Sequence, residues 1–141
     1  MIRIFSNQKK IFGEIKLEAS KSISNRLLII KNLTNLDSKI HNLSNANDTQ
    51  VLLKVLSNFE NKETINCEDA GTALRFIIPF LASKKGKWEI FGTKRMRQRP
   101  VGPLVESLKQ LGCHISYLEK EGFPPVYISS NGLVGGSLSI K

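Results

Sequence analysis

The sequence has few of the residues that build disulfides, metal sites or membrane spans. It contains only two cysteines, and Cys67 and Cys113 lie far apart with no CxxC spacing. His41 and His114 do not cluster with them, so we expect no metal site. We expect both cysteines to be small buried residues in a reducing cytoplasm. No apolar run approaches the ~18 residues of a membrane span. The N-terminal residues also lack the pattern of a signal peptide.

What the chain does have is basic charge. It carries 21 lysines and arginines against 12 acidic residues, a formal net charge of +9 over 141 residues. A basic balance of this kind indicates anionic partners. It leaves nucleic acid, phosphorylated metabolites and acidic lipids open as partner classes. The hydrophobic content of 40% fits one compact domain with a real core.

Hydrophobic periodicity predicts four helices separated by short strands. We expect a helix over 22–32, a second capped by 47–49, a third opening at 69–72, and a fourth from 101 to 111 that Gly112 ends. Pro79 should kink the third helix or end it early. Short strands are predicted at 2–5, 11–17, 38–43, 64–67, 88–91, 113–118, 126–130 and 137–140. The fold class is therefore α+β, an arrangement often filed as α/β.

The first predicted helix has two distinct faces. Its apolar positions recur at helical spacing, with Ser22, Asn25 and Arg26 forming a polar stripe away from them. The pattern from Ser20 to Arg26 recurs weakly, 49 residues later, from Asp69 to Arg75. A βαβαββ unit used twice, with the first unit abbreviated, accounts for this repeat. The apolar positions are Ile23, Leu27, Ile30 and Leu33.

The first helix opening is a candidate anion site. Helix N-termini present unpaired N–H groups and the positive end of the macrodipole. Lys21 lies beside such an end, Ser22 can cap the helix or donate to an anion, and Arg26 projects from the same side of the first turn. The simpler alternative is a plain serine N-cap with two cations beside it.

The second opening combines Asp69, Gly71 and Thr72 with Arg75 on an otherwise apolar helix. Gly71 has no Cβ atom, so a ligand can approach the backbone closely. The alternative for Arg75 is an ion pair with Asp69 or another carboxylate, because a buried arginine needs a partner.

The third opening is the most charged. Arg95, Arg97 and Arg99 alternate, so they share one face if the segment is extended, and Pro100 favours that conformation for Arg99. Their guanidinium groups suit carboxylate or phosphate; the alternative is a solvated basic loop. Three cationic openings indicate a ligand with two or more anionic groups. No acid–base pair is evident, since nothing in the sequence brings Asp48 and Glu68 together.

Several stretches closely resemble the signatures of one enzyme family, in the family's order from about Ile11 to the end of the chain. They are Ser20-Lys21-Ser22-Ile23-Ser24-Asn25-Arg26, Ala70-Gly71-Thr72-Ala73-Leu74-Arg75-Phe76, Arg95-Met96-Arg97-Gln98-Arg99-Pro100-Val101-Gly102-Pro103-Leu104-Val105 and Glu121-Gly122-Phe123-Pro124-Pro125. The chain thus resembles the EPSP synthases (3-phosphoshikimate 1-carboxyvinyltransferases).

The resemblance implies the enolpyruvyl transferase fold, which has two domains of repeated βαβαββ units and about three times this length. The chain then looks like roughly two units of the first domain. Residues 19–141 would form the partial N-terminal domain, and the strands in residues 1–18 would belong to the other domain. The full-length protein is expected to be a cytoplasmic monomer.

The implied reaction transfers the enolpyruvyl group of phosphoenolpyruvate to shikimate 3-phosphate through a tetrahedral intermediate and releases phosphate. It uses no metal or organic cofactor. By resemblance, Lys21 is catalytic and contacts both substrates, Ser22 and Arg26 hold shikimate 3-phosphate, and Gly71 and Arg99 line the phosphoenolpyruvate subsite, where glyphosate also binds. The family's catalytic Asp and Glu would lie outside this chain, which predicts no turnover by the chain alone. Further candidates are Asp69, Thr72, Arg75 and Arg95.

The sequence departs from the family pattern in three places. Glu18-Ala19 replaces the usual Pro-Gly, and Asp69 replaces an asparagine. A carboxylate cannot donate a hydrogen bond unless protonated, so capping is the expected role of Asp69. The hairpin between the second helix and Asp69 also looks shortened.

Two alternatives compete with this interpretation. A basic βαβαββ RNA-binding module fits the charge, but the strands lack interleaved aromatic residues for base stacking and no GxxG loop is present. The sister enzyme that acts on UDP-N-acetylglucosamine would be expected to have Lys-Asn at the first opening. We therefore expect small-molecule substrates, no nucleic acid and no membrane.

Overall fold

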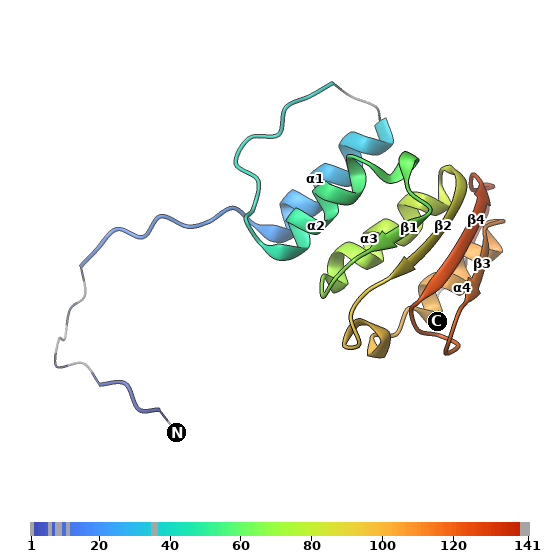
Figure 1. Ribbon diagram of the computed structural model, residues 1–141. Helices are drawn as coiled ribbons and strands as arrows, with labels where there is room; N and C mark the ends of the chain where they lie inside the picture. The colour runs from blue at the N-terminus through green and yellow to red at the C-terminus, as the bar shows by residue number, and fades with distance from the viewer. Residues whose placement is uncertain (1, 6, 8–9, 11, 35–36, 139–141) are drawn as a thin grey trace.

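A computed structural model describes residues 2–5, 7, 10, 12–34 and 37–138 of the chain. Helices pack on one side of a twisted sheet (Figure 1). The elements are α1 (Lys21–Thr34), α2 (Asn47–Leu56), the 3-10 turn η1 (Phe59–Asn61), β1 (Thr64–Asn66), α3 (Gly71–Ala82), β2 (Lys85–Phe91), the 3-10 turn η2 (Met96–Gln98), α4 (Gly102–Gln110), β3 (His114–Tyr117) and β4 (Val126–Asn131).

The second half of the chain forms one complete βαβαββ unit. The sheet has the order β1-β2-β4-β3, with β1 and β2 parallel and the other two pairs antiparallel. The crossover through α3 joins the parallel pair, as parallel strands require. The α+β class is confirmed. The first half supplies α1 and α2, but the strand predicted at 38–43 does not form.

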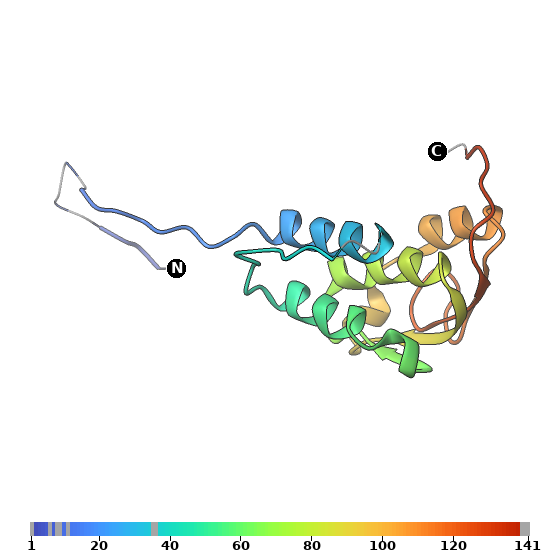
Figure 2. The ribbon, with the colours of Figure 1, turned by 90° about the horizontal axis from the view of Figure 1, so that it is seen from above.

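The strands predicted near both ends of the chain do not form among the described residues. The described residues among 2–5 and 12–17 form no strand, and their side chains are exposed. They run away from the packed body (Figure 2). A two-stranded hairpin is at best marginally stable by itself, and here no sheet receives it. Residues 137–138 form no strand either, while residues 11, 139 and 140 lie outside the described residues.

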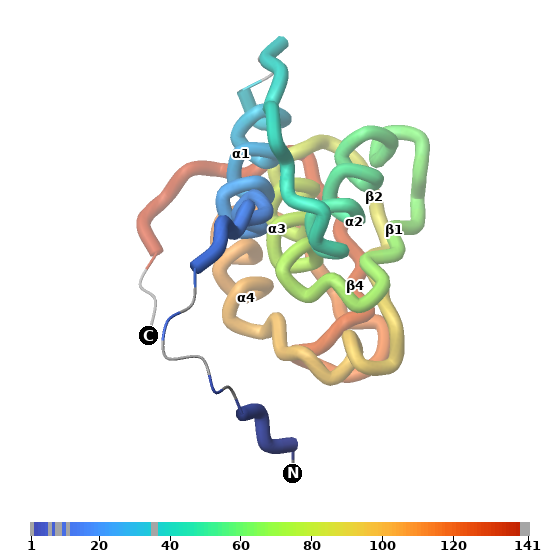
Figure 3. Tube along the Cα trace, turned by 90° about the vertical axis from the view of Figure 1, so that its left-hand side faces the viewer, coloured from blue at the N-terminus to red at the C-terminus, as the bar shows by residue number. Residues whose placement is uncertain are grey.

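α3 is the central helix, as its uniformly apolar sequence predicts. It packs on β2 and β4, contacts α1 and α2 on its other side, and has α4 beside it (Figure 3). Pro79 does not end it early: the helix continues to Ala82, and the N–H of Ser83 donates to the Pro79 carbonyl at 3.1 Å. Its buried residues are Gly71, Ala73, Leu74, Ile77, Ile78, Phe80, Leu81 and Ala82.

α1 faces the opposite way from the prediction. The apolar stripe of Ile23, Leu27, Ile30 and Leu33 is 41–62% exposed, whereas Ser24 and Asn25 are buried. The reason is hydrogen bonding to the segment before α2 and to the first turn of α2. Ser24 Oγ accepts from the N–H of Ser44 at 3.0 Å, and Asn25 Oδ1 accepts from Thr49 Oγ1 at 2.8 Å. These bonds hold Ser24 and Asn25 inward, while Ser22 and Arg26 stay exposed as predicted.

Other local predictions are confirmed. Gly112 follows the end of α4 with φ of 91°, a left-handed conformation that glycine adopts without strain. Cys67 and Cys113 are both buried. Burial and the charge of Glu68 raise the pKa of the Cys67 thiol to about 12. No described helix combines the length and hydropathy needed to cross a membrane.

Candidate functional site

The first residues of α1, α2 and α3 lie at one end of the molecule (Figure 1), which Figure 3 views head on. Side chains link these helix starts to one another and to the loop before α4, as described below. The positive dipole ends of these three helices therefore collect on one surface. Such a surface attracts anions.

The start of α1 carries Lys21, Ser22 and Arg26 on exposed or half-buried positions. The predicted cap is wrong by two residues. The helix begins at Lys21, and Ser20 Oγ accepts from the N–H of Ile23 at 3.4 Å, so Ser20 is the capping residue. Ser22 lies in the first turn, where its carbonyl accepts from Arg26 Nη1 at 3.1 Å. The Ser22 hydroxyl is therefore not needed for capping.

Asp48 joins the starts of three helices. It lies in the first turn of α2, and its Oδ1 atom is 3.6 Å from Lys21 Nζ at the start of α1. Its Oδ2 atom accepts from the N–H of Thr72 in α3 at 2.9 Å. Burial raises the pKa of Asp48, but the hydrogen bond from Thr72 and the charge of Lys21 outweigh it, and the pKa falls below its ordinary value of 3.8. The Asp48 side chain is therefore a negatively charged carboxylate that lies between the starts of α1 and α3.

Sequence reasoning missed this role of Asp48 because the bond to Thr72 spans 24 residues. The segment 47–49 was expected to cap α2, but Ala46 holds the capping position and makes no side-chain cap. Asp69 was expected to cap α3. Instead its carboxylate accepts from the Thr93 hydroxyl, in the loop after β2, while the capping position of α3 is Ala70.

Arg99 lies directly against Gly71. A Cβ atom at Gly71 would collide with Arg99 Nη1 and would lie 3.1 Å from Arg99 Cζ. The absence of a side chain at Gly71 thus lets the guanidinium rest on the first turn of α3. Arg99 has the extended conformation expected before Pro100, with φ of −94° and ψ of 116°. Lys21 is the first residue of α1, Gly71 is the first residue of α3, and Arg99 lies against Gly71, so the three candidate residues lie at the same end of these helices.

The predicted alternation of the loop arginines is wrong. The 3-10 turn η2 interrupts the extended segment, with Arg95 at its start. Arg97 forms an ion pair with Glu119. Arg95, Arg97 and Arg99 therefore do not share one extended face, and Arg95 is exposed.

Arg75 has backbone partners instead of the predicted carboxylate. Its Nη1 atom donates to the Gly71 carbonyl at 3.3 Å, and its Nη2 atom donates to the Pro100 carbonyl at 3.1 Å. The side chain is exposed, so the expectation of a buried arginine was also wrong. The bond from Arg75 to Gly71 matches the bond from Arg26 to Ser22, 49 residues earlier. The weak sequence repeat thus has a geometric counterpart.

The two carboxylates considered as an acid–base pair have different partners. Asp48 contacts Lys21 and Thr72, whereas Glu68 pairs with Lys54 at 3.5 Å. Glu18, at the altered turn before α1, accepts from Asn45 Nδ2 at 3.3 Å. Together these contacts equip this end of the molecule for binding anions and assign neither Asp48 nor Glu68 a proton-transfer partner.

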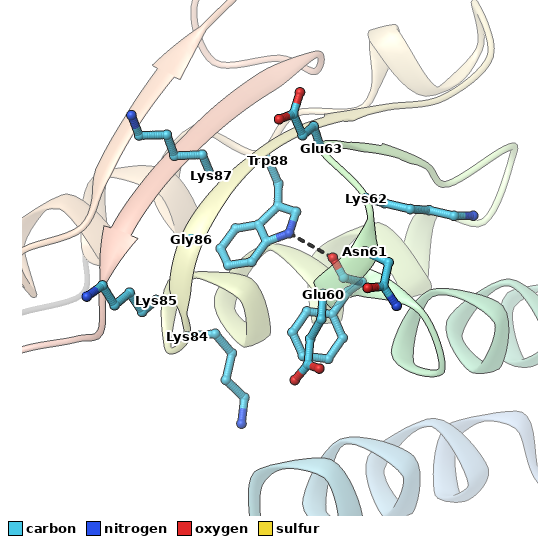
Figure 4. A pocket seen from close by; sticks show the side chains of 10 residues that line it. Glu60, Asn61, Lys62, Glu63, Lys84, Lys85, Gly86, Lys87 and Trp88 are labelled. Atoms are coloured by element: carbon cyan, nitrogen blue, oxygen red, sulfur yellow. Dashed lines mark hydrogen bonds between the residues drawn. The ribbon is translucent and has the colours of Figure 1, made fainter.

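A cavity of about 600 Å³ lies at the opposite end of α3 (Figure 4). Four lysines contribute to it, but Lys84 and Lys87 point in different directions in Figure 4. The Trp88 indole N–H donates to the Phe59 carbonyl at 3.1 Å and has no free hydrogen to offer a ligand. The cavity adjoins the end of α3, and helix C-termini carry negative partial charge that disfavours anions. Its lining residues are Phe59, Glu60, Asn61, Lys62, Glu63, Lys84, Lys85, Gly86, Lys87 and Trp88.

Fold and site thus define an α+β protein in which helix starts and cationic side chains share one surface. The family model for EPSP synthase (3-phosphoshikimate 1-carboxyvinyltransferase) matches residues 5–65 and 57–141. The chain belongs to the EPSP synthase family. The two matched stretches meet in the short connection from α2 to β1, where the sequence suggested a shortened hairpin.

Relatives named 3-phosphoshikimate 1-carboxyvinyltransferase match most of the chain. One from Bacteroides fragilis is 46% identical over 138 residues, covering 98% of this chain and 33% of the relative. One from Shewanella halifaxensis is 36% identical and covers 94% of this chain and 37% of the relative. The chain therefore spans about a third of the length of these relatives. The matches favour the EPSP synthase interpretation over an RNA-binding module or the UDP-N-acetylglucosamine enzyme.

Solved structures show the same fold. An EPSP synthase from Acinetobacter baumannii superposes with a TM-score of 0.74 and 16% identity, covering 89% of this chain and 33% of that one. A second structure of the enzyme from that organism gives a TM-score of 0.75. At this level of identity the likeness concerns the fold alone.

Proposed function

We propose that the chain forms a substrate-binding half of a 3-phosphoshikimate 1-carboxyvinyltransferase. Such an enzyme transfers the enolpyruvyl group of phosphoenolpyruvate to shikimate 3-phosphate and releases phosphate, a step towards chorismate and the aromatic amino acids. The observation that carries the proposal is that Lys21 begins α1, Gly71 begins α3 and Arg99 lies against Gly71, while Asp48 contacts the starts of both helices. Both substrates are polyanions, and this surface offers cations and helix N-termini to them.

Each proposed role fits the chemistry of its residue. Lys21 contacts both substrates, because its ammonium group lies between the starts of α1 and α2. Ser22 and Arg26 hold the 3-phosphate of shikimate 3-phosphate through a hydroxyl and a planar guanidinium. Gly71 and Arg99 bind phosphoenolpyruvate where the guanidinium rests on the first turn of α3. Thr72 and Arg95 stay secondary candidates.

The remaining groups of the active site come from other parts of the full-length enzyme. Two features support this part of the proposal. The chain spans about a third of its relatives, and large apolar residues stay exposed on α1 and in the described part of 2–17. Residues 19–141 then correspond to part of the N-terminal domain, and residues 1–18 to strands of the second domain. The full-length enzyme works as a cytoplasmic monomer without metal, organic cofactor or nucleic acid.

Titration of the 15N-labelled chain with shikimate 3-phosphate tests the binding proposal. The amide signals of Lys21, Ser22 and Arg26 should shift, whereas shikimate without the phosphate should leave them unchanged. An Arg26→Met variant should weaken the response by about tenfold, the scale of one lost charged hydrogen bond. Absence of any shift at millimolar shikimate 3-phosphate would contradict the proposal.

An assay of phosphate release from both substrates tests the half-site proposal. The 141-residue chain should bind ligand without turnover, because the family's catalytic carboxylates are expected in other parts of the enzyme. Phosphate release that depends on both substrates, and that Lys21→Met abolishes, would overturn the idea that the chain is only a binding half.

A further inference from the structure

Arg75 connects the two backbone segments on which the contact between Gly71 and Arg99 depends. It belongs to α3, one turn after Gly71, and its guanidinium donates to the Gly71 carbonyl at 3.3 Å. The other end of the same guanidinium donates to the Pro100 carbonyl at 3.1 Å. Pro100 follows Arg99 directly in the chain. The Arg75 side chain therefore connects Gly71, against which Arg99 lies, to Pro100, which follows Arg99 in the chain.

The other contacts of the loop that carries Arg99 do not involve the Pro100 carbonyl. The loop is anchored near its beginning by buried Met96, which is 1% exposed, and after its end by the bond from the Val101 N–H to the Gly122 carbonyl at 2.8 Å. The N–H of Arg99 bonds within the turn, to the Met96 carbonyl. Proline has no N–H group, so Pro100 offers only its carbonyl as a hydrogen-bonding group, and Arg75 occupies that carbonyl.

The chemistry of arginine suits this bridge. A guanidinium is a planar fork that can donate to two acceptors at once, whereas an ammonium is a compact point charge on a flexible stem. The bridge also holds two guanidinium groups close to one glycine. Two neighbouring cations repel each other, so an anion bound beside them gains attraction from both. A side chain that fixes their arrangement before the anion arrives reduces the ordering cost of binding.

We propose that Arg75 is a positioning residue that holds Arg99 over Gly71 for an anionic ligand. It acts through the Pro100 carbonyl and does not need to touch the ligand. The proposal deepens the proposed function, on which its ligand rests, because phosphoenolpyruvate is the anion assigned to Gly71 and Arg99. The positioning itself concerns the ligand-free chain.

The test compares Arg75→Lys and Arg75→Met in the full 141-residue chain. Lysine keeps the charge and loses the fork, whereas methionine loses both. Lys94→Met is the matched control, because it removes one charge from an exposed position in the loop that carries Arg99. The first measurement is the order of the Arg99 side-chain Nε–Hε group by 15N relaxation without ligand. The second is the Kd for phosphoenolpyruvate by chemical-shift titration.

Both Arg75 variants should loosen the Arg99 side chain and raise the Kd about tenfold, the effect expected from losing charged hydrogen bonds. Lys94→Met should do neither. Unchanged Arg99 order in both Arg75 variants would overturn the proposal, and so would wild-type behaviour of Arg75→Lys, which would assign the effect to charge alone. If the wild-type chain does not bind phosphoenolpyruvate, the proposed function fails for that substrate. The relaxation measurement then still decides whether Arg75 positions Arg99.

Discussion

The ammonium group of Lys21 lies 3.6 Å from one carboxylate oxygen of Asp48. The other oxygen accepts from the N–H of Thr72. One side chain from α2 therefore connects the start of α1 with the start of α3. Cationic side chains and positive helix ends repel one another, and this carboxylate is the negative charge placed among them.

The Asp48 contacts predict a specific dependence of stability on pH. The pKa of Asp48 is lower in the folded chain than its ordinary value of 3.8. The contribution of the carboxylate to the free energy of unfolding is therefore present above that value and is lost as the pH falls through the folded-state pKa. Asp48→Ala should cost about 1–2 kcal/mol near pH 6, the scale of a lost helix cap. Urea unfolding from pH 6 to pH 2.5 measures this.

The matched variant for this prediction is Asp48→Asn, which keeps an oxygen acceptor for Thr72 and removes the charge. Its loss of stability near pH 6 should be smaller than that of Asp48→Ala and should shrink as the pH falls. Glu18→Gln removes a charge from the same end of the molecule, where Glu18 contacts Asn45 and not Lys21. A stability difference for Asp48→Asn that is the same at both ends of the pH range would contradict the assignment.

Gly71→Ala should separate binding from stability. The new Cβ atom would collide with the end of the Arg99 side chain, which is flexible and can move away. Alanine also favours helix over glycine, so the free energy of unfolding should stay within about 1 kcal/mol of wild type. The affinity for phosphoenolpyruvate should fall at least tenfold. Calorimetry with Gly102→Ala as a control checks this, since a Cβ at Gly102 meets its nearest atom at 3.6 Å.

The buried pair of Asn25 and Thr49 predicts a coupling energy between α1 and α2. Asn25 Oδ1 accepts from Thr49 Oγ1, and among the described residues Asn25 Nδ2 has no hydrogen-bond partner. Asn25→Ala leaves the Thr49 hydroxyl unpaired and should cost about 1–3 kcal/mol. Combining it with Thr49→Val should cost less than the sum of the two single changes. A double-mutant cycle by urea unfolding measures the coupling, and strict additivity would argue against the bond.

The sequence predicts elements well where many residues repeat one pattern. α3 is apolar on nearly all sides, and the residues of β4 alternate between buried and half-buried positions, so both elements appear close to the predicted positions. The orientation of α1 was not predictable in the same way. Its burial is decided by Ser24 and Asn25, whose partners lie 20 and 24 residues away. Tertiary hydrogen bonds here override the hydrophobic pattern, and no local signal announces them.

The candidate site shows the same division. Lys21, Gly71 and Arg99 were proposed as site residues from the type and local order of residues at helix starts. The partners of Asp48 and Arg75 were not, because each bridges segments about 25 residues apart. Local sequence thus predicted the groups that line the surface. The contacts that fix those groups relative to one another required the fold.

The exposed apolar face of α1 predicts a surface that promotes association. Replacing an apolar residue on this face by a polar one should leave the stability of the chain unchanged. Ile30 is 53% exposed and Leu28, on the opposite side, is 4% exposed. Ile30→Ser should change the free energy of unfolding by less than about 0.5 kcal/mol, while lowering the binding of a hydrophobic dye and any self-association seen by analytical ultracentrifugation. Leu28→Ala should instead cost about 2–5 kcal/mol because it leaves a cavity in the core. If Ile30→Ser destabilises the chain as much as Leu28→Ala does, α1 packs with its apolar stripe inward, and the orientation derived from Ser24 and Asn25 is wrong.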